Sequence, residues 1–376
     1  MFGCVPEGPP DLNHPSHILM LPFRTSMNLP HLRARWILLA TVVATLGCST
    51  PNAQTTNRRP GNPATVLAPM PEPVTSFAAV THDGWLYVCG GHKGERHDYN
   101  ASRVSGAFHR LELSSGTTWE TLPATAPGQG MPLVAHRNHI IRTGGMAARN
   151  NPGEKQDLVS SAAVLQFDTR TLRWDALPSL PDVRSSHDAV VVGDTLVVGG
   201  GWSLSGGTNA PAWPDHGLTL DLRHPERGWK KFQQPFRRRA LALAAIGTKI
   251  HFIGGMDSDN KPTLAVDVYD LASGAWSKGP DLPEGRFKGF ACSAIAQSGS
   301  IYANMFQGDL LRLTAGSNTW EKVGRVTHPR MAHRLVTAGD RQLIVLGGED
   351  GEDKRPDLEL LSPNAAPAST LSAATR

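Results

Sequence analysis

Short apolar runs, separated by pairs of turn-forming residues, recur along most of the chain. Within each run apolar and polar residues tend to alternate, and β-branched residues are common, as in Thr195–Gly201 and Gln342–Gly348. Gly193-Asp194 and Gly339-Asp340 separate pairs of such runs at the distance of a tight hairpin. Alternating runs bounded by turn residues predict antiparallel β-strands. The pattern therefore predicts an all-β fold.

Two markers show that the strands belong to repeated units. Glycine pairs end the second strand of five units, and they are Gly90-Gly91, Gly144-Gly145, Gly199-Gly200, Gly254-Gly255 and Gly347-Gly348. The first three intervals between pairs are 54, 55 and 55 residues, and the last is 93, which fits two shorter units. Trp119, Trp174 and Trp229 each precede the next pair by 25 residues. A period of roughly 40–50 residues is typical of propellers and other repeat arrays.

Six units account for the repeated region, and five of them contain four strands. They span residues 75–122, 131–177, 185–233, 240–278, 288–323 and 332–361. The last unit has only three runs, whereas residues 65–71 resemble a fourth strand and its exit. We therefore expect the N-terminal strand to complete the last unit, because sheet proteins must cover their open edges.

The glycine pair, the downstream tryptophan and the Pro-Arg-x-x-His sequence of residues 329–333 resemble the kelch-repeat β-propellers. The resemblance covers residues 64–362. It implies a six-bladed propeller of four-stranded antiparallel blades around a central channel, with the last blade closed by the N-terminal strand. Ala303-Asn304 departs from the pattern, since the fifth unit has no glycine pair there.

The N-terminal region reads as an export signal. Arg33 and Arg35 precede an apolar run from Trp36 to Gly47, which is too short to span a bilayer but suits a secretory signal. The end of the run resembles a bacterial lipobox, although Thr45 replaces its usual leucine, so lipid attachment at Cys48 and simple cleavage nearby both remain open. We expect a leader at residues 1–47, starting at Met1, Met20 or Met27. A polar tether at 48–63 and a disordered tail at 363–376 complete the predicted organisation, for a protein exported to the periplasm or outer envelope of a bacterium.

Composition narrows the partners only slightly. The chain has 376 residues with 38 glycines and 29 prolines, as expected for many strands joined by turns. The net charge of +4 is a mild bias, and no basic stripe with interleaved aromatic residues supports a nucleic-acid partner. Membrane contact is expected only through the possible lipid anchor. Cys89 and Cys292 lie in apolar runs, and we interpret both as core residues.

Arginines near the start of successive first strands are candidate ligand-binding residues. They are Arg184, Arg238, Arg286 and Arg330. If the ring closes, the four side chains are expected on one rim of the channel, where guanidinium groups would suit a carboxylate or a phosphate. The alternative is that these arginines are a feature of the repeat and bind backbone carbonyls.

Trp202 and Trp213 fall outside the repeated tryptophan position and lie in one of three long loops. These loops span residues 92–104, 146–160 and 202–215. Functional residues are often carried by such loops. A sugar could stack on either indole ring, or the rings could anchor the loop by packing.

No cofactor and no metal site is predicted. His92, Glu95, His97 and Asp98 lack the ligand spacing of a known zinc or calcium loop, so we interpret them as a solvated loop. Copper-radical oxidases share the propeller architecture but need a tyrosine cross-linked to a cysteine. Tyr87 and Cys89 lie on one strand, too close in sequence for that site, and we reject this activity.

Two functions remain open at this stage. The first is a non-catalytic binding or protein-interaction module at the cell envelope, whose partner is an unknown protein or an acidic carbohydrate or other carboxylate. The second is an isomerase, since the chain is also similar to periplasmic kelch propellers that interconvert sialic acid anomers. That chemistry needs an acid–base group, for which His187 and His333 are candidates by position. Histidine is also an ordinary repeat residue there, and an envelope scaffold is a weaker third possibility.

Overall fold

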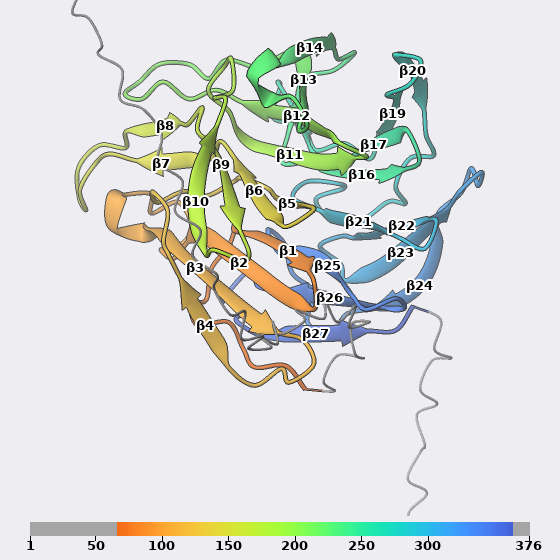
Figure 1. Cartoon of the computed structure of the whole chain (residues 1–376), viewed down its shortest axis with the longest axis horizontal. Coiled ribbons are helices and arrows are strands. Elements are labelled where there is room, and N and C mark those ends of the chain that lie inside the picture. Colours follow the sequence, from red (N-terminus) through yellow and green to blue (C-terminus); the bar gives the residue numbers. More distant parts are fainter. Residues whose placement is uncertain (1–65, 364–376) are drawn as a thin grey trace, which may run out of the picture. The chain divides into compact units, whose positions relative to one another are not determined.

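The computed structural model describes residues 66–363, and six β-sheets dominate this region (Figure 1). The expected leader, tether and lipidation site lie outside the described residues, as does the tail from residue 364 onward. In the described part of the chain, no helix is long and apolar enough to cross a membrane. Two 3₁₀ turns, Ala101–Arg103 and Pro225–Arg227, are the helical elements of this region.

Each sheet is one blade of antiparallel strands, numbered here from the inner strand outward. Blade one contains β1 (Ala78–His82), β2 (Trp85–His92), β3 (Val104–Glu112) and β4 (Trp119–Leu122). Blade two contains β5 (Leu133–His136), β6 (His139–Thr143), β9 (Val164–Asp168) and β10 (Arg173–Leu177). Blade three contains β11 (Ser185–Val192), β12 (Thr195–Trp202), β13 (His216–Asp221) and β14 (Lys230–Gln233).

The remaining blades repeat this order with shorter connections. Blade four contains β16 (Ala242–Ile246), β17 (Lys249–Ile253), β19 (Val266–Asp270) and β20 (Ala275–Lys278). Blade five contains β21 (Ser293–Gln297), β22 (Ser300–Asn304), β23 (Asp309–Thr314) and β24 (Glu321–Arg325). Blade six contains β25 (Arg334–Ala338), β26 (Gln342–Leu346) and β27 (Leu358–Leu361). Two small ladders extend the loops, β7 (Met146–Ala148) with β8 (Leu158–Ser160) and β15 (Arg238–Arg239) with β18 (Met256–Asp257).

The blades close into a ring because each inner strand lies beside the inner strands of two other blades. The order of contact is β1, β5, β11, β16, β21, β25 and back to β1. Six apolar clusters fill the six blade interfaces, so the core is distributed around the ring. Cys89 and Cys292 are buried free thiols in two of these clusters, as expected from the sequence. The structure is a six-bladed β-propeller.

A chain of backbone hydrogen bonds links the blades around the channel. One small residue at or just before the start of each inner strand has φ between 50° and 62°, and the six are Ser76, Gly130, Ser186, Ala240, Ala291 and Ala332. Along this series the amide of each residue donates to the carbonyl of the preceding blade's residue, and Ser76 N donates to Ala332 O, at 2.7–3.0 Å. Among the described residues the one missing link is between Ala332 N and Ala291 O. We call these six residues the channel ring.

The repeated tryptophan has a structural role at the outer edge of each interface. Its indole Nε1 donates to a backbone carbonyl at the exit of the preceding blade, as in Trp174 to Pro123 O and Trp229 to Pro178 O, both at 2.8 Å. Trp276 and Trp320 make the corresponding bonds at 2.9 Å. The repeated tryptophan therefore marks a hydrogen bond between neighbouring blades.

The N-terminal segment closes the ring at blade six. Trp119 Nε1 donates to Ala68 O at 3.2 Å. Ala68 therefore occupies the position that the exit of the preceding blade occupies at the other interfaces. Met70 N donates to Pro356 O at 2.8 Å, just as Leu180 N donates to Ala162 O in blade two. Within the described residues this segment supplies the exit of a fourth strand rather than a regular strand. Pro69 and Pro71 lack the amide hydrogens that a sheet ladder needs.

The glycine marker of the third unit is displaced by one residue from its expected position. Gly200 and Gly201 have φ of 67° and 91°, whereas Gly199 is an ordinary residue of β12 that pairs with Asp188. A Cβ on Gly199 would clash with the ring of Phe252 in the next blade. Three successive glycines therefore serve two purposes, close packing at the first and a left-handed turn at the other two.

Candidate functional site

Three of the predicted arginines are buried and hydrogen-bonded within their own blades. Arg184 and Arg330 are fully buried, and Arg238 is 3% exposed. In each, Nη1 donates to two backbone carbonyls, one at the glycine pair and one near the start of the third strand. The acceptors are Gly200 and His216, Gly254 and Ala265, and Gly347 and Asp357 respectively, at 2.9–3.4 Å. These contacts agree with the alternative interpretation of the sequence, in which the arginines are a feature of the repeat and bind backbone carbonyls. They fix the strands of each blade.

Carboxylates complete two of these arginine sites. Arg238 Nη2 donates to Asp267 at 2.5 Å, and both side chains are 4% exposed. Arg330 Nη2 donates to Asp357 at 2.6 Å. Arg184 instead lies 3.3 Å from His216 Nε2, and burial lowers its pKa to about 10.

Arg286 does not occupy the position of the other three arginines. Each of those lies two residues before the channel ring, where blade five has Gly289. Gly289 packs directly against Gly254, so no side chain fits there. Arg286 is exposed, and its guanidinium carbon lies 4.9 Å from the ring centroid of Phe287 and 5.4 Å from that of Phe306. The expected rim of four equivalent arginines is therefore corrected to three buried arginines and one exposed side chain.

Trp202 and Trp213 form a half-buried cluster with an arginine that the sequence did not single out. Their ring centroids lie 5.8 Å apart. The guanidinium carbon of Arg239 lies 4.1 Å from the centroid of Trp202, 6.0 Å from that of Trp213 and 5.6 Å from that of Phe290. Such distances are typical of cation–π contacts. We call these four residues the aromatic–arginine cluster.

The cluster lies beside the channel ring and contains unsatisfied donors. Arg239 immediately precedes Ala240, and Phe290 immediately precedes Ala291. Arg239 Nε and Trp202 Nε1 are buried and have no hydrogen-bond acceptor among the described residues. Burial lowers the pKa of Arg239, and the nearby Tyr99 hydroxyl opposes that shift. A cation with free donors on an aromatic surface suits a ligand that carries a carboxylate.

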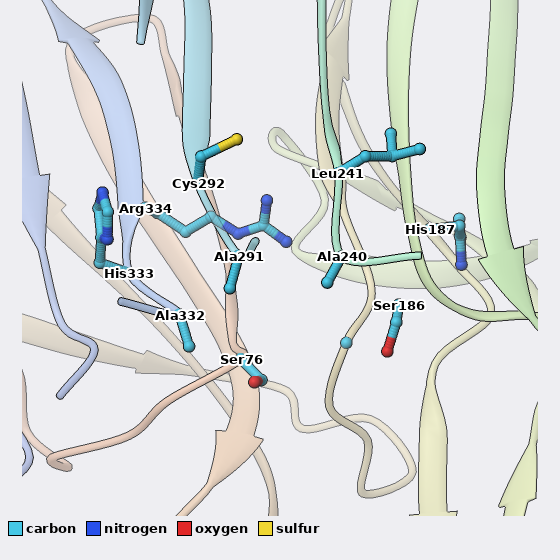
Figure 2. Close-up of a pocket in the computed structure, with 11 residues that line it drawn as sticks. Ser76, Ser186, His187, Ala240, Leu241, Ala291, Cys292, Ala332, His333 and Arg334 are labelled. Atoms are coloured by element: carbon cyan, nitrogen blue, oxygen red, sulfur yellow. The ribbon is translucent and has the colours of Figure 1, made fainter. Parts of the chain in front are cut away.

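A pocket of about 70 Å³ lies at the channel ring. All six ring residues line it, together with His187, Leu241, Cys292, His333 and Arg334. Figure 2 shows the Arg334 side chain reaching from its strand into the middle of the pocket, with His187 and His333 on opposite sides. The pocket thus brings both candidate histidines together around one guanidinium group.

Arg334 is held across the channel by several blades. Nε donates to Phe77 O at 2.9 Å, and Nη2 donates to Met131 O at 3.0 Å. Nη1 lies 3.6 Å from Oδ1 of Asp188, whose Oδ2 accepts from Leu243 N at 2.9 Å. Burial raises the pKa of Asp188, and the charge of Arg334 opposes this shift.

His187 and His333 are both 3% exposed and stand where other blades have apolar residues such as Leu241 and Cys292. Burial, followed by nearby arginine charges, lowers the pKa of each histidine to about 3. His187 Nε2 lies 2.8 Å from Thr143 Oγ1, whereas both ring nitrogens of His333 lack a partner in the described region. Both rings are therefore neutral at pH 7. No group of three side chains suited to a metal ion occurs among the described residues.

Sequence reasoning missed Arg239, Arg334 and Asp188. The sequence does contain a signal for Arg334 and Asp188. Blades three and six share the spacing Arg-x-x-His, and the next residue is Asp188 in blade three and Arg334 in blade six. Opposite charges at equivalent positions of opposite blades point to a contact across the channel. Arg239 follows a buried arginine directly and projects to the other face of its short strand.

The ring of six blades with a ligand-sized pocket at its channel defines a propeller with a candidate binding face. The Kelch motif matches residues 237–283, which cover blade four. The chain is 26% identical to Kelch-like protein terF of Aspergillus terreus over 226 residues, covering 58% of this chain and 47% of that protein. It is also 26% identical to human Kelch-like protein 34 over 200 residues, covering 49% of this chain and 31% of that protein. The chain is thus a six-bladed β-propeller that carries a kelch motif in blade four and is similar to kelch proteins.

A solved structure shows the same fold. The chain matches the structure of YjhT with a TM-score of 0.64 and 16% identity, covering 79% of this chain and 97% of that one. At this identity the likeness shows the fold alone. The chain spans about half or less of the two curated relatives' own lengths, so their activities and partners are not transferred with the repeat.

Proposed function

We propose that this protein is an exported binding module that takes an acidic segment of a protein partner on its aromatic–arginine cluster. The observation that carries the proposal is the position of Arg239 between aromatic rings with a buried, unpaired Nε. A buried donor without an acceptor costs roughly 1–3 kcal/mol, which a ligand carboxylate would recover. Aromatic residues and arginine are also the side chains most enriched at the centres of protein interfaces.

The location of the binding face supports a protein partner. The cluster lies on the face that carries the long loops, which include Trp213, and all four side chains remain half-buried. Half-buried aromatic rings can contact an extended peptide without unfolding the loop. The kelch repeat that the relatives share does not identify a ligand, because one fold serves many functions. The partner's chemistry is therefore inferred from the aromatic–arginine cluster alone.

The cellular location is a separate part of the proposal. The apolar run before Cys48 and the polar segment after it support export with attachment of lipid at Cys48. We expect the expressed protein to fractionate with bacterial envelopes and the Cys48→Ser variant to appear in the soluble periplasmic fraction. Recovery of the unprocessed chain in the cytoplasm would contradict export.

The binding test uses a fluorescein-labelled heptaglutamate peptide and measures fluorescence anisotropy. We expect saturable binding that weakens at least tenfold in Arg239→Gln and in Trp202→Ala. Arg237→Gln is the matched control, because Arg237 is an exposed neighbour whose Nη2 is paired with Asp215 at 3.2 Å. Equal loss in the control, or no binding by the wild-type protein, would reject the proposed surface.

The Trp202–Trp213 pair favours an acidic sugar as a second candidate ligand. Two indole rings 5.8 Å apart offer a stacking surface next to the Arg239 cation. Turnover separates an enzyme from a binder, so the anomer ratio of N-acetylneuraminic acid is followed by NMR with catalytic amounts of protein. Faster approach to equilibrium supports an isomerase, and an unchanged rate with saturable binding supports a module that only binds.

A further inference from the structure

The channel pocket contains a cation whose hydrogen-bonding capacity is only partly used. A guanidinium group carries five N–H donors. For Arg334, Nε and one Nη2 donor are satisfied by Phe77 O and Met131 O. The Asp188 carboxylate lies 3.6 Å from Nη1, too far for a hydrogen bond. Apart from the ion pair with Asp188, at least one Nη1 donor and one Nη2 donor have no hydrogen-bond acceptor in the described region.

Other polar groups around the same pocket are also unpaired. The hydroxyls of Ser76 and Ser186 line it and have no hydrogen-bond partner among the described residues, and Figure 2 shows both below the Arg334 guanidinium. The amide of Ala332 is the one channel-ring donor without a carbonyl partner. His333, with 3% exposure, has two unpaired ring nitrogens. The two serines and Ala332 are only partly buried, so their donors are accessible to a ligand, whereas His333 is the buried unpaired group of this set.

The charge around the pocket favours an anion. Arg334 is the charged residue among those that line it, and no carboxylate lines it. Arg184 and Arg330 lie close enough to His187 and His333, respectively, to contribute to the lowered pKa of each ring. The Asp188 carboxylate, 3.6 Å from this guanidinium, does not itself line the pocket.

The size of the pocket limits the anion. A cavity needs roughly 10–15 Å³ of such volume for one water molecule, so about 70 Å³ admits a few waters or a few heavy atoms. That volume suits a small anion such as acetate or lactate. Because a guanidinium edge matches the two oxygens of a planar carboxylate, this geometry selects carboxylates over spherical ions.

We propose that the channel pocket is a binding site for a carboxylate of two or three carbons, held by Arg334 and the hydroxyls of Ser76 and Ser186. The carboxylate lies against the free Nη donors, and its short carbon chain lies against Ala240, Ala291 and Leu241. This site is separate from the aromatic–arginine cluster, so it does not depend on the function proposed above.

The test measures thermal unfolding of the full chain against acetate and lactate at fixed ionic strength, with sodium chloride, phosphate and neutral acetamide as comparison solutes. We expect a saturable rise in Tm with acetate or lactate only. Equal effects of acetate and acetamide would overturn the anion site. A rise with phosphate alone would overturn the assignment to carboxylates, and no saturable shift with any carboxylate would overturn the site.

Two variants connect the shift to the pocket. Ser76→Ala/Ser186→Ala should fold normally, because blades four, five and six already have alanine at this position, and should weaken carboxylate affinity several-fold. Ser298→Ala is the matched control, since Ser298 also has φ near 50° but is exposed. Arg334→Gln should abolish the shift. Unchanged affinity in the double serine variant and in Arg334→Gln would overturn the proposal even if carboxylates bind elsewhere.

Discussion

Arg334 and Asp188 occupy equivalent positions in the inner strands of opposite blades, and they meet across the central channel with 3.6 Å between Nη1 and Oδ1. Through Phe77 O and Met131 O, Arg334 also reaches the segments ahead of β1 and β5. Asp188 accepts from Leu243 N in blade four. The pair therefore connects five of the six blades at the axis of the ring.

Breaking this pair should destabilise the ring. Arg334→Gln leaves the Asp188 carboxylate buried without its cation, a change that typically costs about 3–5 kcal/mol in the free energy of unfolding. Asp188→Asn keeps an acceptor for Leu243 N, so the double variant Asp188→Asn/Arg334→Gln should lose less than the sum of the single variants. Urea unfolding of the four proteins measures the coupling. Strict additivity would show that the pair does not interact.

The buried histidines should make stability depend on pH. The pKa of His187 and of His333 is about 3 in the folded protein and near 6.5 when unfolded, so the unfolded chain binds more protons on acidification. The contribution of the two neutral histidines to the free energy of unfolding is complete above pH 6.5 and is lost as the pH falls toward 3. Each histidine contributes a slope of about 1.4 kcal/mol per pH unit in that window.

His333→Leu tests this contribution directly. Leucine occupies the equivalent position in blade four as Leu241, so the variant should retain the fold. Urea unfolding between pH 7.5 and pH 4.5 should show a shallower loss of stability in the variant than in the wild type. Parallel curves for the two proteins would mean that His333 does not titrate on unfolding in this range.

The buried and exposed arginines should respond differently to truncation. Arg330→Ala leaves the carbonyls of Gly347 and Asp357 and the carboxylate of Asp357 without their donor, and should cost about 3 kcal/mol or more. Arg286→Ala removes an exposed side chain and should change stability by less than about 0.5 kcal/mol. Differential scanning calorimetry of both variants separates these roles. Equal destabilisation would contradict the different placements.

The indole hydrogen bonds between blades should each contribute a measurable increment. Trp229→Phe keeps most of the ring but removes the Nε1 donor to Pro178 O, and should cost about 1 kcal/mol. Trp85→Phe is a suitable comparison, because the Trp85 indole nitrogen has no hydrogen-bond partner in the described part of the chain. A cost in Trp229→Phe no larger than in Trp85→Phe would count against the bond between blades.

Strand positions and ring closure were predictable from the sequence because each blade repeats the same physical requirements. Glycine pairs mark left-handed turns, and tryptophans mark bonds to the preceding blade, so both recur in phase. Arg286 was misplaced because sequence spacing alone could not show that Gly289 fills the equivalent position.

The site was harder to predict because its residues meet through closure of the ring. Arg334 and Asp188 are far apart in sequence, and only the ring places their blades opposite each other. The stacking of Trp202 on Arg239 depends on the path of a long loop, which no repeat constrains. Trp202 and Trp213 were recognisable as candidates because they depart from the repeated tryptophan position.

The bond from Met70 N to Pro356 O has a consequence for the order in which the protein matures. The outer edge of the last blade is completed by a segment that is synthesised first. This N-terminal segment must therefore remain unpaired while five blades are made. Until Pro356 has emerged, the growing chain is an open arc with an exposed apolar flank at each end. During that interval a chaperone that shields apolar surface would have two distinct sites on this one nascent chain.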